Sequence, residues 1–325
     1  MSARNPKRRV AVLDLGSASF HLVIADVKEP ASITVVVDKR EDLALGRSVG
    51  ETGGVERSET DRAISVAKRF AEKAKRAQAS DVIAVATSAL RIASNGERLL
   101  EGIEEETGHE VRALSGEAEA ILAYVGARAG LSMKDGATVV ADLGGGSLDV
   151  ARGVGPRVLS TASLPLGSLR LAGEWIESDP PSAAEWGRLA QHVWDTMPEL
   201  DGFGTDDPRL VVTGGTAKAL ARLDARDQDA DLDGGYRLDR DAINKLEYGS
   251  MSSKRSDRRN LPGMCERRVD SAGPGAVVLH ALMETLSIGS LTVSRWGFRE
   301  GIMLATLRTD GHSVLVEMEA EEPAA

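Results

Sequence analysis

Two stretches of this sequence share one layout, and that repeat constrains the fold more than any other feature. Residues 139–150 contain an apolar run that ends in an Asp, then three glycines and a serine, then a second apolar run. Residues 10–20 have the same order, with Asp14 followed by Gly16 and Ser17. Apolar runs separated by Gly/Ser turns predict strand–turn–strand units. Two such units predict two related halves that face one ligand.

The turn of each unit suits a phosphate group. Phosphate needs several converging N–H donors, and Gly144, Gly145 and Gly146 remove side chains from its path and permit positive φ. An Asp at a strand end repels phosphate, so Asp14 and Asp142 are expected to hold Mg²⁺ or its waters. Gly-rich turns between apolar runs are most often plain hairpins. Two copies with the same Asp-to-Gly spacing favour a phosphate site.

Length and periodicity predict two α/β domains, at residues 1–130 and 131–308, with an acidic tail at 309–325. The boundary and a possible hinge are expected near 130–136, and the last helix is a candidate for packing back on the first domain. Strands are expected at 10–15, 20–27, 33–38, 81–86, 111–114, 139–142, 148–154, 157–163, 210–212 and 291–294. Helices are expected at 58–77, 96–107, 116–129, 168–176, 183–197, 217–223, 274–286 and 298–307; Ser58 is the expected cap of the first, and the second is expected to be capped by Asn95 and stopped by Gly108.

Composition limits the classes of partner. The formal net charge of −10 argues against non-specific binding of nucleic acid and against an anionic membrane surface. Cys265 is the single cysteine, so no internal disulfide can form and a reducing compartment is expected. The start of the chain does not read as a signal peptide, and no uncharged apolar run is long enough to span a bilayer. We therefore expect a cytoplasmic protein.

Two further motifs are candidates for the site. Gly214, Gly215 and Thr216 form a Gly-rich turn between an expected strand and an expected helix, where N–H groups and the helix dipole favour an anion. Glu119 lies in the first turn of the helix that follows Ser115. A glutamate there is commonly only a complement to the helix dipole, so its role is open at this point.

The densest basic cluster of the chain has two interpretations, a solvated loop or a track for a polyanion. It consists of Lys254, Arg255, Arg258, Arg259, Arg267 and Arg268.

Taken together, the motifs resemble the exopolyphosphatase and guanosine-pentaphosphate phosphohydrolase (Ppx/GppA) family, in its short two-domain form. The resemblance covers nearly the whole chain. It rests on the blocks at residues 14–17, 86–91, 115–120, 142–147, 164–167, 214–216 and 299–301. It implies an α/β fold of the acetate-kinase/actin-like type, with two ribonuclease-H-like domains and the active site in the cleft between them.

The resemblance also implies roles for individual residues. Glu119 matches the catalytic base of the family. Around the metal it implies Asp14, Asp142 and Asp149, with Mg²⁺ as the cofactor. On the phosphates, motif and resemblance together imply Gly16, Ser17, Arg91, Gly144, Gly145, Gly146, Ser147, Gly214, Gly215, Thr216 and Arg268. Arg267 is the alternative to Arg268 as the second phosphate-binding arginine.

Three positions depart from the family pattern. Ala18 stands where Asn is usual, Leu148 where Thr is common, and Asp149 where Glu is common. The first change removes an amide from the phosphate turn. The third keeps the charge but shortens the side chain by one methylene, so that a water is expected between Asp149 and the metal.

The expected reaction is Mg²⁺-dependent hydrolysis of the terminal phosphoanhydride of inorganic polyphosphate, with short chains preferred. Alternatives are a guanosine-pentaphosphate phosphohydrolase, a phosphotransferase on the same fold, and a non-catalytic sensor of polyphosphate or alarmones. The resemblance favours a homodimer.

Overall fold

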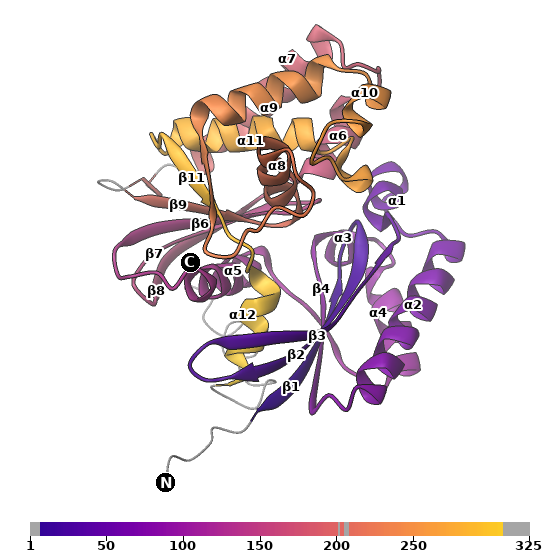
Figure 1. Cartoon of the computed structure of the whole chain (residues 1–325). Coiled ribbons are helices and arrows are strands. Elements are labelled where there is room, and N and C mark those ends of the chain that lie inside the picture. Colours follow the sequence, from indigo (N-terminus) through magenta and orange to yellow (C-terminus); the bar gives the residue numbers. More distant parts are fainter. Residues whose placement is uncertain (1–6, 201, 205–207, 308–325) are drawn as a thin grey trace. The chain divides into compact units, whose positions relative to one another are not determined.

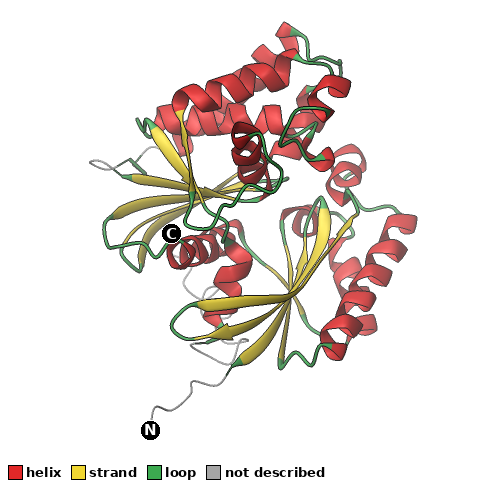
Figure 2. Ribbon diagram, viewed as in Figure 1, coloured by secondary structure: helices red, strands yellow, loops and turns green. Residues whose placement is uncertain are grey.

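The computed structural model describes residues 7–200, 202–204 and 208–307 of the 325-residue chain. The chain forms two compact units, Met1–Ala118 with Arg299–Ala325, and Glu119–Phe298. Each unit is built on one mixed β-sheet with helices (Figure 1, Figure 2). The expected acidic tail lies outside the described residues.

The first sheet has the strand order β3-β2-β1-β4-β5. β1, β2 and β3 pair antiparallel as a meander, whereas β4 and β5 run parallel to β1. Its strands are β1 (Arg8–Leu15), β2 (Ser19–Lys28), β3 (Ser32–Asp42), β4 (Asp81–Ala86) and β5 (Val111–Ala113). The central strands are almost continuously buried, which explains their unbroken apolar sequences.

Helices complete the first unit. They are α1 (Leu45–Thr52), α2 (Arg57–Arg76), α3 (Ser88–Ile92), α4 (Gly96–Thr107) and, from Arg299 onward, α12 (Phe298–Ala305). α2 buries one apolar face in the core of this unit, as its periodicity predicts. The predicted cap at Ser58 is wrong. Glu56 is the N-cap, because its side chain and that of Glu59 form a reciprocal capping box.

The second sheet has the order β10-β11-β9-β6-β7-β8. Its strands are β6 (Ala137–Leu143), β7 (Leu148–Val154), β8 (Arg157–Leu164), β9 (Arg209–Thr213), β10 (Tyr236–Asp239) and β11 (Ser290–Val293). β8-β7-β6-β9-β11 repeats the order and directions of β3-β2-β1-β4-β5, and β10 is added at the edge. The two halves are thus related, as the repeated motif predicts.

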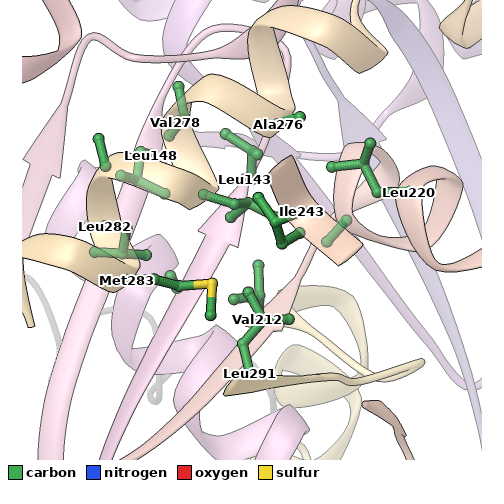
Figure 3. Close-up of a cluster of buried hydrophobic side chains, with 14 of the residues drawn as sticks. Leu143, Leu148, Val212, Leu220, Ile243, Ala276, Val278, Leu282, Met283 and Leu291 are labelled. Carbon is green, nitrogen blue, oxygen red and sulfur yellow. The ribbon is translucent and has the colours of Figure 1, made fainter. Parts of the chain in front are cut away.

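Helix α11 lies at the centre of the second unit and is buried along most of its length. α11 comprises Ala272–Thr285, and it contacts α6 (Ser168–Trp175), α7 (Ala183–Thr196), η1 (Met197–Leu200), α8 (Gly215–Ala225) and α9 (Arg240–Ser252). The unit also contains α10 (Arg255–Arg259) and η2 (Glu266–Arg268), and α5 (Gly116–Gly130) packs on the other face of the sheet. Leu143 and Val212 from the strands meet Ile243, Leu220 and Leu282 from the helices in this core (Figure 3). The sequence patterns did not predict α1, α9, α10 or β10.

The two units divide at a different place from the expected boundary at 130–136. From Glu119 onward α5 groups with the second unit, because Ala120, Ala123, Tyr124 and Ala127 pack on Val140, Ala151 and Val211 of the second sheet. Residues 131–136 therefore connect two elements of one unit. The chain passes between the units at 118/119 and at 298/299.

Among the helices that the structure describes, none combines the length and the apolar character needed to cross a membrane.

Candidate active site

The two expected phosphate turns are the same hairpin. In the first, the N–H of Gly16 donates to the carbonyl of Ser19 over 3.2 Å, between β1 and β2. In the second, the N–H of Gly144 donates to the carbonyl of Ser147 over 3.0 Å, between β6 and β7. Each turn directly follows a strand that carries an Asp one residue before its end.

The start of α6 holds the second turn in place. The N–H of Ser168 donates to the carbonyl of Gly144, and the N–H groups of Leu169 and Arg170 donate to the carbonyl of Gly145, at 2.9–3.1 Å. In a trans peptide the N–H points opposite to the C=O. The N–H groups that share these two peptides therefore point away from α6 and are available to an anion.

The first turn is held in the same way by the segment that begins α1. Gly46 donates its N–H to the carbonyl of Ser17 over 2.8 Å, and Leu43 and Ala44 both donate to the carbonyl of Ala18. The backbone here is positioned by main-chain hydrogen bonds alone, and residue 18, an alanine, contributes no side-chain amide.

Close packing behind the second turn requires a glycine at residue 167. A Cβ on Gly167 would lie 2.2–2.4 Å from backbone atoms of Gly145 and Gly146. The turn between β8 and α6 thus supports the phosphate turn by backbone-to-backbone contact.

Asp14 is buried and makes an ion pair. Arg299 on α12 donates to its Oδ2 over 2.9 Å and also contacts Nδ1 of His21 over 2.7 Å. The other ring nitrogen of His21 lies 2.6 Å from a carboxylate oxygen of Asp38. Burial lowers the pKa of His21, although the hydrogen bond to Asp38 opposes this effect. A neutral ring that accepts from Arg299 and donates to Asp38 satisfies both contacts.

The other expected site residues of the first unit, Ser17 and Arg91, also make contacts within that unit. The hydroxyl of Ser17 is 3.0 Å from that of Ser88, at the start of α3. Arg91 is exposed and donates to the carbonyl of Leu114, just before the loop that begins α5. Arg91 thus supports the segment that leads to Glu119.

Four polar residues form a row across the second sheet. Asp142 on β6 is the direct partner of Asp149 on β7 and of Thr213 on β9, and Asp149 is the partner of Ser163 on β8. Direct partners lie on the same face of a sheet. This is the face that α5 covers, because Val140, two residues before Asp142, packs on α5.

Within the row, Asp149 is held by two hydroxyl groups. Its side chain is almost fully buried, with the residue 3% exposed. Ser147 donates to Oδ2 over 2.7 Å and Ser163 donates to Oδ1 over 2.5 Å. Both oxygens of this carboxylate therefore accept from the protein.

The start of α8 contacts the same strand ends. Gly214 has φ of +94°, and a Cβ there would lie 2.6 Å from Oδ1 of Asp142 and 2.4 Å from the carbonyl of Leu143. A Cβ on Gly215 would lie 2.0 Å from Nη2 of Arg268. Only glycines allow the carboxylate and the guanidinium to approach this helix end so closely.

Arg268 and Thr216, two of the expected phosphate-binding residues, contact one another. Arg268 donates to Oγ1 of Thr216 over 3.3 Å. The same hydroxyl lies 2.7 Å from that of Ser168 and is fully buried, so Thr216 anchors its neighbours. Arg267 is exposed. Of the two competing arginines, Arg268 is therefore the one beside the turn.

Glu119 differs clearly from the other glutamate in the first turn of α5. The hydroxyl of Ser115 accepts from the N–H of Ala118 over 3.1 Å, as an N-cap does. Glu117 is exposed, as expected of a residue that only complements the helix dipole, whereas Glu119 is 7% exposed. The next residue, Ala120, packs on the face that carries the polar row.

The carboxylates at the second turn are few, but Mg²⁺ needs few protein ligands. Among the described residues there is no group of three or more His, Cys, Asp or Glu side chains placed to hold a metal. Mg²⁺ commonly uses only one or two carboxylates and completes its shell with waters and phosphate oxygens. Asp142, which lies beside Asp149 and is partly exposed, fits that requirement.

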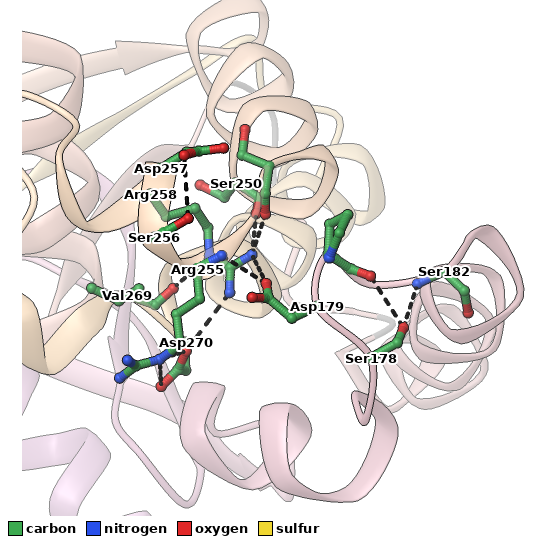
Figure 4. Close-up of polar contacts among 12 residues, drawn as sticks. Ser178, Asp179, Ser182, Ser250, Arg255, Ser256, Asp257, Arg258, Val269 and Asp270 are labelled. Atoms are coloured by element: carbon green, nitrogen blue, oxygen red, sulfur yellow. Dashed lines mark hydrogen bonds and ion pairs between the residues drawn. The ribbon is translucent and has the colours of Figure 1, made fainter.

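One residue of the basic cluster, Arg258, is a structural brace (Figure 4). Arg258 is buried and donates to the carbonyls of Ser250, Ser253 and Val269. It also lies 3.7 Å from carboxylate oxygens of Asp179 and Asp270. The interpretation of Arg258 as part of an exposed polyanion track is wrong, because five oxygen partners enclose its guanidinium.

Other cations of the cluster are paired at the surface. Arg255 contacts Asp270 at 2.9 Å, and Arg259 contacts Glu266 at 2.7 Å. Lys254 and Arg267 are exposed, and the described residues form no ion pair with either. These two cations are what remains of the predicted track.

Sequence patterns did not identify several residues that shape the site. Ser163 and Thr213 join it through strand register, which no local pattern reveals. Arg299 belongs to a family block, and the block gave no indication of its contact with Asp14.

Comparison with known proteins gives a consistent result. The model of the Ppx/GppA phosphatase family matches residues 23–310. Exopolyphosphatase 1 of Mycobacterium bovis is 31% identical over 309 residues, which cover 93% of this chain and 89% of that protein. A guanosine-5'-triphosphate,3'-diphosphate pyrophosphatase of Aeromonas salmonicida is 26% identical and covers 91% of this chain but 59% of its own length.

Solved structures agree with this result. A Ppx/GppA family member from Aquifex aeolicus has a TM-score of 0.82 at 28% identity, over 94% of this chain and 99% of that chain. An exopolyphosphatase from Cytophaga hutchinsonii has a TM-score of 0.83 at 25% identity, over 93% and 98%. The predicted two-domain α/β fold of the actin-like type is confirmed. The chain belongs to the Ppx/GppA phosphatase family.

Proposed function

We propose that this phosphoanhydride hydrolase removes terminal phosphate groups from inorganic polyphosphate in a reaction that depends on Mg²⁺. One observation carries the proposal. At the carboxyl ends of β6 and β9, an anchored glycine turn, a carboxylate row and Arg268 converge beside the start of α8. This combination suits a charged phosphoryl group, whose transfer requires positioning and neutralisation of charge.

Each residue is assigned a role that follows from its chemistry. The N–H groups of Gly145 and Gly146, which point away from α6, donate to non-bridging oxygens. The guanidinium of Arg268 neutralises charge on the same phosphate. Glu119 accepts the proton of the attacking water and orients it in line with the scissile bond.

In the second unit, Mg²⁺ would be held by Asp142, beside the carboxylate of Asp149. When bound, it supplies positive charge to the phosphate oxygens. Arg299 already neutralises Asp14 from one side, so Asp14 keeps a fixed orientation.

Similarity to known proteins supports polyphosphate, rather than guanosine pentaphosphate, as the proposed substrate. The relative named exopolyphosphatase is more similar in sequence than the one named for the guanosine nucleotide, and the match covers more of its length. Short chains are proposed as the better substrates, because within the described basic cluster only Lys254 and Arg267 are exposed without an ion pair and could contact distant phosphates.

Phosphate release measured across triphosphate, long polyphosphate, guanosine pentaphosphate and ATP, with and without Mg²⁺, tests this function. We expect rapid release from polyphosphate that EDTA abolishes. Faster release from guanosine pentaphosphate would reassign the substrate. Transfer to ADP or a sugar instead of water would identify a phosphotransferase, and binding without turnover a sensor.

The role of Glu119 has a matched control two residues away in the same helical turn. Glu119→Gln keeps size and hydrogen bonding but cannot accept the proton, so turnover should fall by about two to four orders of magnitude while substrate binding remains. Glu117→Gln removes an equal charge from the same helix end and should leave turnover nearly unchanged. Equal effects of the two substitutions would show that only the helix dipole is involved.

We also propose that the protein forms a homodimer, which the family resemblance favours. A separate proposal is that it works in the reducing cytoplasm, in keeping with the single cysteine of the chain. Light scattering coupled to gel filtration would measure the mass, and a monomer at micromolar concentration would rule the dimer out.

A further inference from the structure

The hydrogen bonds around Asp149 determine how Ser147 faces the site. A serine hydroxyl has one hydrogen and two lone pairs, and a carboxylate only accepts. Ser147 therefore uses its single hydrogen on Asp149, at 2.7 Å. What remains on Oγ is a pair of acceptor lone pairs. These repel phosphate oxygens but suit a cation.

Ser163 completes the arrangement from the next strand. It is the direct partner of Asp149, and its hydroxyl donates to the other carboxylate oxygen over 2.5 Å. With one hydroxyl on each oxygen, the carboxylate cannot rotate without losing a hydrogen bond. Burial of the residue to 3% exposure makes that loss costly.

The arrangement depends on features of this particular chain. Asp149 is short, so its carboxylate stays within the sheet, where the neighbouring strand can reach it. The corresponding position of the first unit, the cross-strand partner of Asp14, is His21, and its own partner on β3 is Arg40. The hydroxyl pair is thus present only in the second of the two related turns.

We propose that Ser147, rather than Asp149, is the direct ligand of the divalent cation, and that Asp149 and Ser163 are positioning residues that turn its lone pairs toward the metal. This inference rests on the proposed function, because it concerns the same site. A hydroxyl that ligates Mg²⁺ beside a phosphate-binding turn is established chemistry in other nucleotide-binding folds. Partners of a ligand that fix its orientation strongly affect metal affinity.

Calorimetric titration of the full-length protein with Mn²⁺, in the absence of any phosphate compound, tests the proposal. Ser147→Ala and Asp149→Asn should each weaken Mn²⁺ binding by about 10-fold or more, and the double variant should be no weaker than either single variant. Ser163→Ala should weaken binding about threefold in the wild-type background and not at all in the Asp149→Asn background. Ser160→Ala, on the same strand, is the matched control and should bind as wild type.

Three results would overturn the proposal. The first is wild-type Mn²⁺ affinity in Ser147→Ala with loss of binding in Asp149→Asn, which would make Asp149 the direct ligand. The second is additive effects of the two substitutions, and the third is absence of Mn²⁺ binding in the wild type. The thermal midpoint of each variant shows whether it folds. If Ser147→Ala does not fold, Ser147→Thr takes its place: this variant retains the hydroxyl, so the proposal expects it to keep Mn²⁺ binding.

Because no phosphate compound is present, the outcome is independent of the substrate. A protein that binds Mn²⁺ as described but does not hydrolyse polyphosphate would contradict the proposed function alone.

Discussion

Glu185 shows how one side chain can organise a loop far from the chemistry. It is the N3 residue of α7, and it accepts hydrogen bonds from the hydroxyls of Ser178 and Ser182 and from the N–H groups of Glu177, Ser178 and Ser182. These bonds, led by the one from Ser178, hold the pKa of Glu185 far below its ordinary value of 4.5. The loop so fixed carries Asp179, a partner of Arg258.

The depressed pKa predicts a pH-dependent contribution to stability. Because the folded state favours the ionised form, Glu185 stabilises the fold fully above pH 4.5 and progressively less as the pH falls below that value. Glu185→Gln should therefore lower the thermal midpoint at pH 7, and the difference from wild type should narrow below pH 4.5. Scanning calorimetry from pH 7 to pH 3 measures the difference in thermal midpoint between the variant and the wild type. Glu199→Gln, at an exposed position, is the control, and a constant gap across the range would contradict the prediction.

At the level of elements, each phosphate turn is positioned by the short helix that follows the third strand of its sheet. Both helices donate backbone N–H groups to turn carbonyls, so the N–H groups on the other side of the turn face a ligand. Related turns thus have related supports, although the sequences of α1 and α6 show no obvious similarity.

Substitutions at two glycines of the α6 region, Gly167 and Gly173, distinguish an effect on the phosphate turn from an effect on the stability of the fold. Gly167→Ala places a Cβ 2.2 Å from the backbone of Gly146, so the turn must shift. We expect a loss of about 1–3 kcal/mol in the free energy of unfolding, together with a large loss of phosphate binding. Urea unfolding and isothermal titration with phosphate measure the two effects.

Gly173→Ala, within the same helix, is the matched control. No atom lies within 4 Å of a Cβ there, so the variant should gain about 0.5–1 kcal/mol in unfolding free energy and keep its phosphate binding. Unchanged binding in Gly167→Ala would show that the turn does not hold the ligand.

At the level of the whole molecule, charge governs the encounter with a polyanion. The chain carries a net charge of −10, and carboxylates pair with three of the six residues of the predicted basic cluster, Arg255, Arg258 and Arg259. Long polyphosphate is therefore repelled except near Arg268 and the exposed cations Lys254 and Arg267.

A comparison of two arginines tests this picture. Arg267→Gln should weaken binding of long chains more than of triphosphate, and added salt should remove the difference, because exposed charges are screened. Arg258→Gln should instead lower the unfolding free energy by about 1–3 kcal/mol, because it leaves the carbonyls of Ser250, Ser253 and Val269 without their donor, and it should not change length preference. Competition assays with polyphosphate chains of defined length measure the length preference of each variant. A length preference altered by Arg258→Gln but not by Arg267→Gln would contradict the assignment.

Local sequence by itself determined the strands and turns of the site. The apolar runs before Asp14 and Asp142 and the glycines after them specify strand, strand end and turn within a dozen residues, because backbone freedom and periodicity are local properties. The repeat of this pattern also predicted two related sheets. Glu119 could be selected from the sequence only by resemblance, since its spacing alone equally fits a helix-dipole complement.

Only the tertiary structure decided which side chains meet. Arg299 contacts Asp14 across 285 positions of the chain, and Ser163 reaches Asp149 through strand pairing. It likewise converted Arg258 from a predicted surface cation into a buried brace. Contacts of this kind depend on register and packing, where a shift of one residue turns a side chain to the opposite face, so no local pattern can specify them.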